Sequence, residues 1–247
     1  MEVSGEIKGA VRLSIIIPAF DELPNLRELI PRIHTTIEEL PNFMTEILVV
    51  LPTIATALEE EEIGVLGARV VIREPGDSFG DAIRCGISSL SAESRYVIVM
   101  DADGSHDPST IPRLLSARHG AHVVVASRYT PGGTTDNSII LRAMSRVLNF
   151  SFSVVLGIQC RDVSTNYKLY IRSDLDQLKL SCMDFDIVEE ILYGIKSLHE
   201  KAFVVREVPD HFYARNHGVT KRRLGLFIAS YLSTLVRLRW QNRGHRK

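Results

Sequence analysis

The chain has 247 residues, a formal net charge of −1 at pH 7, 45% hydrophobic residues and 24% charged residues. These totals are typical of a soluble globular protein, and the balanced charge argues against nucleic acid as a partner. The three cysteines lie far apart with no metal-ligand spacing, which fits a reducing compartment. Residues 1–12 lack the apolar stretch of a secretory signal, and no run reaches the roughly 20 apolar residues of a membrane span. We therefore expect a cytoplasmic location.

Strand and helix patterns alternate through the first half of the chain. Short β-branched runs predict strands, and apolar residues three or four apart predict helices. The expected strands are 11–20, 46–51, 68–72, 97–100 and 122–127, and the expected helices are 21–37, 55–62, 82–90 and 108–120. This alternation predicts βαβ units, and therefore an α/β fold with a mainly parallel central sheet flanked by helices.

The second half of the sequence is less regular. Residues 129–136 are rich in Gly, Thr and Pro and predict a mobile loop, and residues 139–156 predict a long helix with a break. Later patterns predict short strand pieces in 162–172, a helix at 186–197, strands at 203–209 and 211–215, and an amphipathic helix at 224–240. Without a repeat or a linker, one domain is the better interpretation.

Two carboxylates follow the buried strand 97–100 directly. Asp101 and Asp103 stand two residues apart where that strand ends. Ligands of open α/β sheets gather at the carboxyl ends of strands, and hard oxygen ligands suit Mg²⁺ or Mn²⁺. The alternative is a solvated turn in which Asp107 caps the next helix, with Pro108 at its first position.

Five segments in the same order resemble the inverting GT-A-type, family 2-like glycosyltransferases, most of all the polyprenol-phosphate (dolichol-phosphate) mannose synthases. The segments are 14–22, 99–103, 127–129, 162–172 and 215–221. The resemblance implies a GT-A nucleotide-diphospho-sugar transferase domain at 11–222. Its nucleotide-sugar half would be 11–127 and its acceptor half 128–222, followed by a C-terminal amphipathic helix and basic tail at 223–247.

The same resemblance implies roles for individual residues. It places the nucleotide-sugar on Pro18, Phe20, Glu22, Gly76, Gly80, Asp101 and Ala102, and a Mg²⁺ or Mn²⁺ ion on Asp101 and Asp103. It assigns catalysis to Asp103, Arg128, Arg215 and Lys221, and the acceptor phosphate to Arg142, Ser145 and Arg146. Simpler interpretations are a helix-terminal acid for Glu22, plain turns for the glycines and a solvated basic face for Arg142 and Arg146. Acids at 186, 189 and 190 stay ambiguous.

The resemblance also implies the reaction: a sugar, mannose-like, moves from a nucleotide-sugar to a polyprenyl or dolichyl phosphate with inversion. A phosphate monoester has a second pKa of about 6, so the acceptor is already a dianion at neutral pH. No strong general base is then needed, and catalysis reduces to positioning and stabilisation of the departing diphosphate.

The end of the second strand departs from the family pattern. Relatives carry an acidic cluster there that holds the nucleoside, whereas residues 51–58 here read Leu-Pro-Thr-Ile-Ala-Thr-Ala-Leu. Asp21 also stands where asparagine is usual. A GDP-mannose-like donor is the expectation from the family, but these changes leave the base uncertain, and a different donor is a prediction of its own.

Two further questions stay open at the level of sequence. Residues 224–238 are markedly apolar and precede a basic tail, which predicts either a helix lying in a membrane interface or a helix packed on the domain. The chain is also compatible with a catalytically inactive binding or regulatory protein at a membrane, although the acid pair argues against it. A sugar nucleotidyltransferase would need a Gly-rich basic loop after the first strand, and Pro18-Ala-Phe-Asp-Glu22 lacks one.

Overall fold

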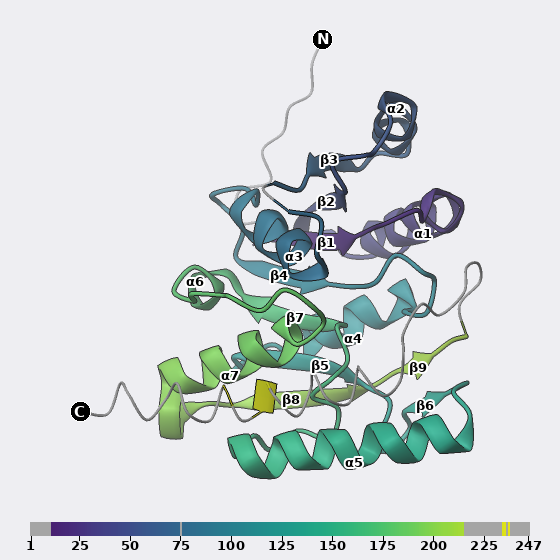
Figure 1. Cartoon of the computed structure of the whole chain (residues 1–247). Coiled ribbons are helices and arrows are strands. Elements are labelled where there is room, and N and C mark those ends of the chain that lie inside the picture. Colours follow the sequence, from purple (N-terminus) through teal and green to yellow (C-terminus); the bar gives the residue numbers. More distant parts are fainter. Residues whose placement is uncertain (1–10, 75, 215–233, 236, 238–247) are drawn as a thin grey trace.

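A seven-stranded sheet in the order β3-β2-β1-β4-β7-β5-β8 runs through the computed structural model, which describes residues 11–74, 76–214, 234, 235 and 237 (Figure 1). Its strands are β1 (Val11–Pro18), β2 (Phe43–Leu51), β3 (Arg69–Ile72), β4 (Tyr96–Val99), β5 (Val123–Ser127), β7 (Lys168–Ile171) and β8 (Val205–Pro209). All neighbours are parallel except β7, which is antiparallel to both β4 and β5. The predicted α/β fold with a mainly parallel, mixed sheet is confirmed.

Helices cover both faces of this sheet (Figure 1). They are α1 (Leu23–Glu38), α2 (Ala57–Val65), α3 (Phe79–Ser88), η1 (Pro108–Thr110), α4 (Ile111–Ser116), α5 (Ile139–Leu156), α6 (Arg172–Leu175), α7 (Ile187–His199) and η2 (Glu200–Ala202). Successive strand residues point to opposite faces, so Ile15 and Ile17 pack with α1 and α4, while Ile16 packs with α3 and α7. Because both faces are buried, the central strands carry long apolar runs, such as residues 15–17, 47–51 and 123–126.

Three expectations were wrong in part, two of them in the second half of the chain. The loop at 129–136 contains a short strand, β6 (Thr134–Thr135), which pairs in parallel with β9 (His211–Phe212). Helix α5 runs without a break over 18 residues. Its start is capped by the Ser138 hydroxyl, which accepts from the Leu141 N–H, and it ends at Gly157 in a left-handed conformation with φ 64°. The helix expected at 108–120 is shorter, because α4 ends at Ser116.

The predicted C-terminal helix lies outside the described residues except at three positions. Thr234 and Leu235 are buried, and the Thr234 hydroxyl donates to the Asp186 carboxylate over 2.6 Å. The Arg237 guanidinium lies 3.1 Å from the same carboxylate. The ambiguous Asp186 therefore anchors part of the C-terminal segment at the start of α7.

Several titratable groups are buried in the second half of the fold. The Lys168 ammonium donates to the carbonyl oxygens of Val163, over 2.9 Å, and of Thr165. Burial lowers the pKa of Lys168 to about 8 and raises the pKa of the Cys160 and Cys182 thiols well above their usual range. These groups make the stability of the fold depend on pH.

We expect the free energy of unfolding to fall as pH rises above about 8.5, where unfolded thiols lose their protons and the folded ones keep theirs. Lys168 acts in the opposite sense, because the folded amine releases its proton near pH 8 and the unfolded amine only near 10.4. In Lys168→Met, the free energy of unfolding should therefore fall more steeply with pH, by at most about 1.4 kcal/mol per pH unit more than in the wild type. Urea unfolding of both proteins from pH 7.5 to 10.5 measures this, and a shallower slope in the variant would contradict it.

Candidate active site

The carboxyl ends of the parallel strands meet at one edge of the sheet, and most predicted site residues follow them. Pro18 ends β1 and Glu22 precedes α1, while Arg128 follows β5 directly. The remaining predicted residues lie between β1 and α1 (Phe20), between β3 and α3 (Gly76), in the first turn of α3 (Gly80), after β4 (Asp101, Ala102, Asp103) and on α5 (Arg142, Ser145, Arg146). Arg215 and Lys221 lie outside the described residues. The topology therefore gathers the strand-end candidates at the place where open α/β sheets bind ligands.

The acid pair is held in place by its neighbours. The Asp101 carboxylate accepts from the Asn166 amide over 2.9 Å, and its backbone N–H donates to His106 Nδ1 over 3.0 Å. Asp103 is only 6% exposed, and it accepts from both the backbone N–H and the hydroxyl of Ser105. Buried His106 stacks on Tyr167 with ring centroids 4.9 Å apart. The loop is thus fixed before any ligand arrives.

Sequence reasoning assigned no role to His106 or Asn166. His106 stands in the same loop, but nothing in the sequence tells that its ring turns back to the Asp101 N–H. Asn166 is 65 residues away from Asp101 and reaches it only because β7 inserts beside β4. The expected cap was present: the Asp107 carboxylate accepts from the Ser109 N–H over 2.9 Å.

The donor set at this loop fits a hard divalent cation. Two carboxylates and the neighbouring Ser and Asn oxygens are the ligand types that Mg²⁺ and Mn²⁺ prefer. Across residues 11–74 and 76–214, no group of three or more His, Cys, Asp or Glu side chains is arranged to hold a metal by itself. A cation here would be completed by substrate oxygens, which is usual for Mg²⁺ in phosphate-handling sites.

A pocket of about 220 Å³ opens between the ends of β1 and β2. Leu51 and Pro52 contribute an apolar wall, and Phe20, 46% exposed, stands at its rim. Glu22 lines the same pocket. The pocket therefore lies where the nucleoside was predicted to bind, and its wall is apolar where the family pattern has acids.

Behind this pocket the loops after β2 and β3 are joined. The Asp77 carboxylate accepts from the Thr53 N–H over 3.0 Å and from the Thr53 hydroxyl over 2.8 Å, and these bonds lower the pKa of Asp77. Arg73 is 3% exposed, and its guanidinium lies 5.7 Å from the ring centre of Phe20. Burial lowers the pKa of Arg73, which nevertheless stays a cation. Hydrogen bonds and the Arg73–Phe20 contact thus fix the loops around the pocket.

The two predicted donor-loop glycines have packing reasons of their own. A Cβ on Gly80 would lie 2.1 Å from the carbonyl oxygen of Cys182, and the Gly80 N–H donates to the Met183 carbonyl over 2.6 Å. A Cβ on Gly76 would lie 2.4 Å from the Asp81 carboxylate. Glu190 fixes the facing segment by accepting from the N–H groups of residues 181 and 182. Close packing within the protein therefore accounts for both glycines. Their contact with a nucleotide stays a prediction.

We expect Gly80→Ala to lower the free energy of unfolding by about 1–3 kcal/mol, because the added methyl group overlaps a backbone oxygen. Gly64→Ala is the matched control. It is also helical, and nothing lies within 4 Å of its added Cβ. That control should be neutral or more stable by up to about 1 kcal/mol. Urea unfolding measures both, and equal effects would show that the overlap with Cys182 is not the cause.

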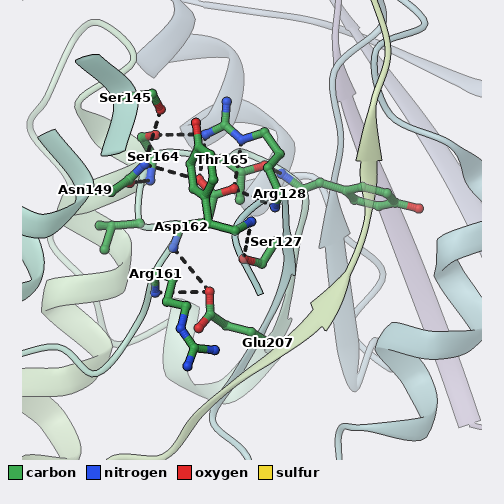
Figure 2. Close-up of polar contacts among 12 residues, drawn as sticks. Ser127, Arg128, Ser145, Asn149, Arg161, Asp162, Ser164, Thr165 and Glu207 are labelled. Carbon is green, nitrogen blue, oxygen red and sulfur yellow. Dashed lines mark hydrogen bonds and ion pairs between the residues drawn. The ribbon is translucent and has the colours of Figure 1, made fainter. Parts of the chain in front are cut away.

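Arg128 is held by a buried carboxylate (Figure 2). Its Nε and Nη2 atoms donate to the two oxygens of Asp162 over 2.8 and 2.6 Å, and its backbone N–H donates to the same side chain over 2.9 Å. Asp162 is fully buried, and Asn149 of α5 contacts it as well. This forked pair fixes the end of β5 to the segment that leads into β7.

Tyr129 links this pair to the predicted acceptor arginines. Its ring centre lies 5.1 Å from the Arg128 guanidinium and 5.3 Å from that of Arg146. Ser145 accepts from the Asn149 amide over 3.3 Å. Of the predicted acceptor residues, Ser145 and Arg146 therefore belong to the same cluster as Arg128. Tyr129 is a further member, which the sequence analysis included in a family segment without giving it a role.

The small sheet of β6 and β9 brings the chain back to the acid loop. The Tyr213 N–H donates to the Ser105 carbonyl over 3.0 Å, and the Ala214 N–H donates to the Asp136 carboxylate over 3.0 Å. Residue 214 is the last described one before Arg215. The segment that carries Arg215 and Lys221 thus starts beside the acid pair.

Comparison with known proteins decides the family. The family described as Glycosyl transferase family 2 matches residues 14–179, which is more than half of the chain. The chain belongs to this glycosyl transferase family. Polyprenol monophosphomannose synthase from Mycolicibacterium smegmatis is 30% identical over 230 residues, covering 87% of this chain and 82% of the relative. Dolichol-phosphate mannosyltransferase from Pyrococcus furiosus is 29% identical over 241 residues, covering 94% of this chain and 65% of the relative.

The GT-A fold of the family 2 protein is also shared with solved structures. Glucosyl-3-phosphoglycerate synthase from Mycobacterium tuberculosis, in complex with Mg²⁺ and uridine diphosphate, superposes with a TM-score of 0.68. The match covers 94% of this chain and 80% of that one at 18% identity, so it establishes the fold alone. The resemblance inferred from the five segments is confirmed.

Proposed function

We propose that this family 2 enzyme transfers a mannose-like sugar from a nucleotide-sugar to a polyprenyl or dolichyl phosphate, with inversion. The observation that carries the proposal is the preorganised pair Asp101 and Asp103 at the end of β4, in a chain whose relatives are named as polyprenol- and dolichol-phosphate mannosyltransferases. A bound Mg²⁺ or Mn²⁺ would neutralise the diphosphate leaving group. Glu22, Phe20 and the pocket beside Leu51 would take the nucleoside.

On the acceptor side, the basic residues of α5 would orient the lipid phosphate. Arg146 is placed by the Tyr129 ring, and Ser145 by Asn149. Arginine forks match phosphate oxygens, and the phosphate dianion can attack without a protein base. Arg215 and Lys221 would enter the site from the segment that starts beside Ser105. The protein then contributes mainly positioning and charge.

The acceptor's lipid tail suggests that the enzyme works at the cytoplasmic face of a membrane. Helix α5 has 18 residues with a mean hydropathy of 1.5, of which only 17% are buried, so it is long and apolar enough to be a membrane-helix candidate by composition. Val147, Phe150 and Val154 are spaced three or four residues apart and form an apolar stripe that is 66%, 70% and 61% exposed. Ile139 and Ile140, at the start of the helix, are exposed as well. With Arg142 and Arg146 on the same helix, this apolar stripe fits a helix lying in the membrane interface.

The function is tested by incubating the protein with Mn²⁺, a polyprenyl phosphate and either GDP-mannose or UDP-glucose. We expect a glycosylated lipid phosphate with inverted anomeric configuration from one donor, identified by mass and by NMR. The absence of product with both donors, together with no melting shift from any nucleotide-sugar, would instead favour a non-catalytic binding protein.

The membrane contact makes a separate prediction. Phe150→Asp should weaken binding to anionic vesicles at least about tenfold, because it removes a large apolar side chain from the stripe and adds repulsion. Val65→Asp on α2 is the control, because Val65 is 82% exposed and lies away from α5. Vesicle co-sedimentation measures both. Equal binding of the two variants would show that α5 does not carry the contact.

A further inference from the structure

The pocket at the ends of β1 and β2 has an apolar interior and a charged rim. Leu26, Leu51 and Ile63 line it and are at most 4% exposed. A nucleoside base that enters such a pocket can stack on Phe20, but its N–H donors lose water and need acceptors there. Those acceptors have to come from the rim.

Three carboxylates line this pocket: Asp21, Glu22 and Glu59. Glu59 belongs to the capping box of α2, where it accepts from the N–H and the hydroxyl of Thr56 over 2.8 and 3.0 Å. Glu22 accepts from the amide of Asn25. No described residue donates a hydrogen bond to the Asp21 carboxylate. Asp21 is therefore the carboxylate of this pocket that no hydrogen bond from a described residue orients or partly occupies.

The backbone at Asp21 has an unusual conformation. Its φ is 58°, in the left-handed region, and Asp21 and Glu200 are the non-glycine residues with positive φ in the described chain. Glycine would fit this conformation at lower cost, although Asp and Asn tolerate it better than most residues. A carboxylate kept at such a position, on the rim of a pocket, points to a role in the site.

We infer that Asp21 is a specificity-determining residue for the donor, whose carboxylate accepts from the N–H edge of the nucleoside base. This inference rests on the proposed function, because it needs the pocket to be the nucleoside site. It explains how the enzyme reads a base although the wall formed by Leu51 and Pro52 offers no acid. Bases that present two adjacent N–H groups match a carboxylate best, as in other forked pairs.

Calorimetric titration with GDP, UDP, ADP and CDP, each with Mn²⁺, tests the inference. Asp21→Asn keeps the shape and tolerates the left-handed backbone. We expect it to raise the Kd of the tightest-binding nucleotide about tenfold or more. The differences in Kd among the four nucleotides should become smaller. Binding of inorganic pyrophosphate with Mn²⁺ should stay unchanged, because pyrophosphate has no base.

Three controls separate recognition of the base from an effect on folding and from recognition of the ribose. Asp21→Gly should lose the same selectivity without a lower melting temperature, since glycine suits the backbone. Glu59→Gln, on the same pocket, keeps the capping box of α2 and should leave both the melting temperature and the selectivity unchanged. The 2′-deoxy form of the preferred nucleotide should be weakened by Asp21→Asn as much as the ribonucleotide is.

The inference is overturned if Asp21→Asn leaves the selectivity among bases intact, if pyrophosphate is affected equally, or if the 2′-deoxynucleotide escapes the effect, which would place the carboxylate on the ribose. A wild-type protein that binds none of the four nucleotides would overturn the proposed function as well. The failures of the two proposals are thus distinguishable.

Discussion

Replacing Asp162 by alanine is expected to lower the free energy of unfolding by about 3–5 kcal/mol, because it leaves the Arg128 guanidinium without its buried partner. The side chain accepts from two guanidinium nitrogens and one backbone N–H of Arg128, and it is fully buried. For a chain of this size the melting temperature should fall by roughly 6–20 °C. Urea unfolding and thermal melting measure the loss.

Asp176→Ala provides the matched control for this experiment. Asp176 pairs with Arg172 at 2.6 Å, the same distance as the closest contact of Asp162, but its side chain is 48% exposed. Exposed pairs contribute about 0–1 kcal/mol. If both substitutions cost the same, burial of the Arg128–Asp162 pair would not be what makes it strong.

The forked pair also bears on the predicted catalytic role of Arg128. A guanidinium committed to Asp162 and lying 3.2 Å from the Ser164 hydroxyl has fewer N–H groups left for a substrate. Its geometry is that of a residue that shapes the site, with Arg146 and Tyr129 beside it. Direct contact with the diphosphate stays a prediction, and loss of activity in Arg128→Ala would need to be separated from loss of folding.

Local sequence patterns were sufficient for the first half of the fold. The β-branched runs of β1 and β2 and the apolar spacing of α1 are signals within single segments, so their order predicted the parallel sheet. The insertion of β7 between β4 and β5 was not predictable in the same way, because its antiparallel pairing depends on segments about 70 residues apart in one case and 45 in the other. The two-residue strands β6 and β9 are too short to leave a periodic signal.

In the candidate site, too, local signals were predictable and long-range contacts were not. Asp101 and Asp103 could be predicted because an apolar run ends in two acids, a pattern visible within a few residues. The partners that fix them, Asn166 and His106, are neighbours only after folding. Gly80 illustrates the converse: the resemblance placed it beside the nucleotide, and only the structure identifies the Cys182 carbonyl as the group that lies where a side chain would be.

The acid pair leads to the second large effect. Asp103→Asn should reduce sugar transfer at least about 100-fold, because it removes a charge where a metal and the leaving diphosphate would meet. Asparagine can still accept the two bonds from Ser105, so the loop should keep its shape. Nucleotide at 100 times its Kd stabilises the wild-type fold by about 2.7 kcal/mol, or roughly 5–10 °C in melting temperature. The variant should lose the Mn²⁺-dependent part of that shift.

Asp176→Asn, at the end of α6 and away from the site, should keep both the transfer activity and the shift. Two results would argue against a metal held by this pair: a wild-type shift that is the same with Mn²⁺ and with a chelator, or an Asp103→Asn protein with full activity. In the first case the positive charges for the diphosphate would have to come from the protein, and Arg215 and Lys221 would become the residues to test next. Asn166 already donates to Asp101. Measuring the Mn²⁺-dependent melting shift of Asn166→Leu would then show whether that hydrogen bond positions Asp101 for a metal or takes the place of one.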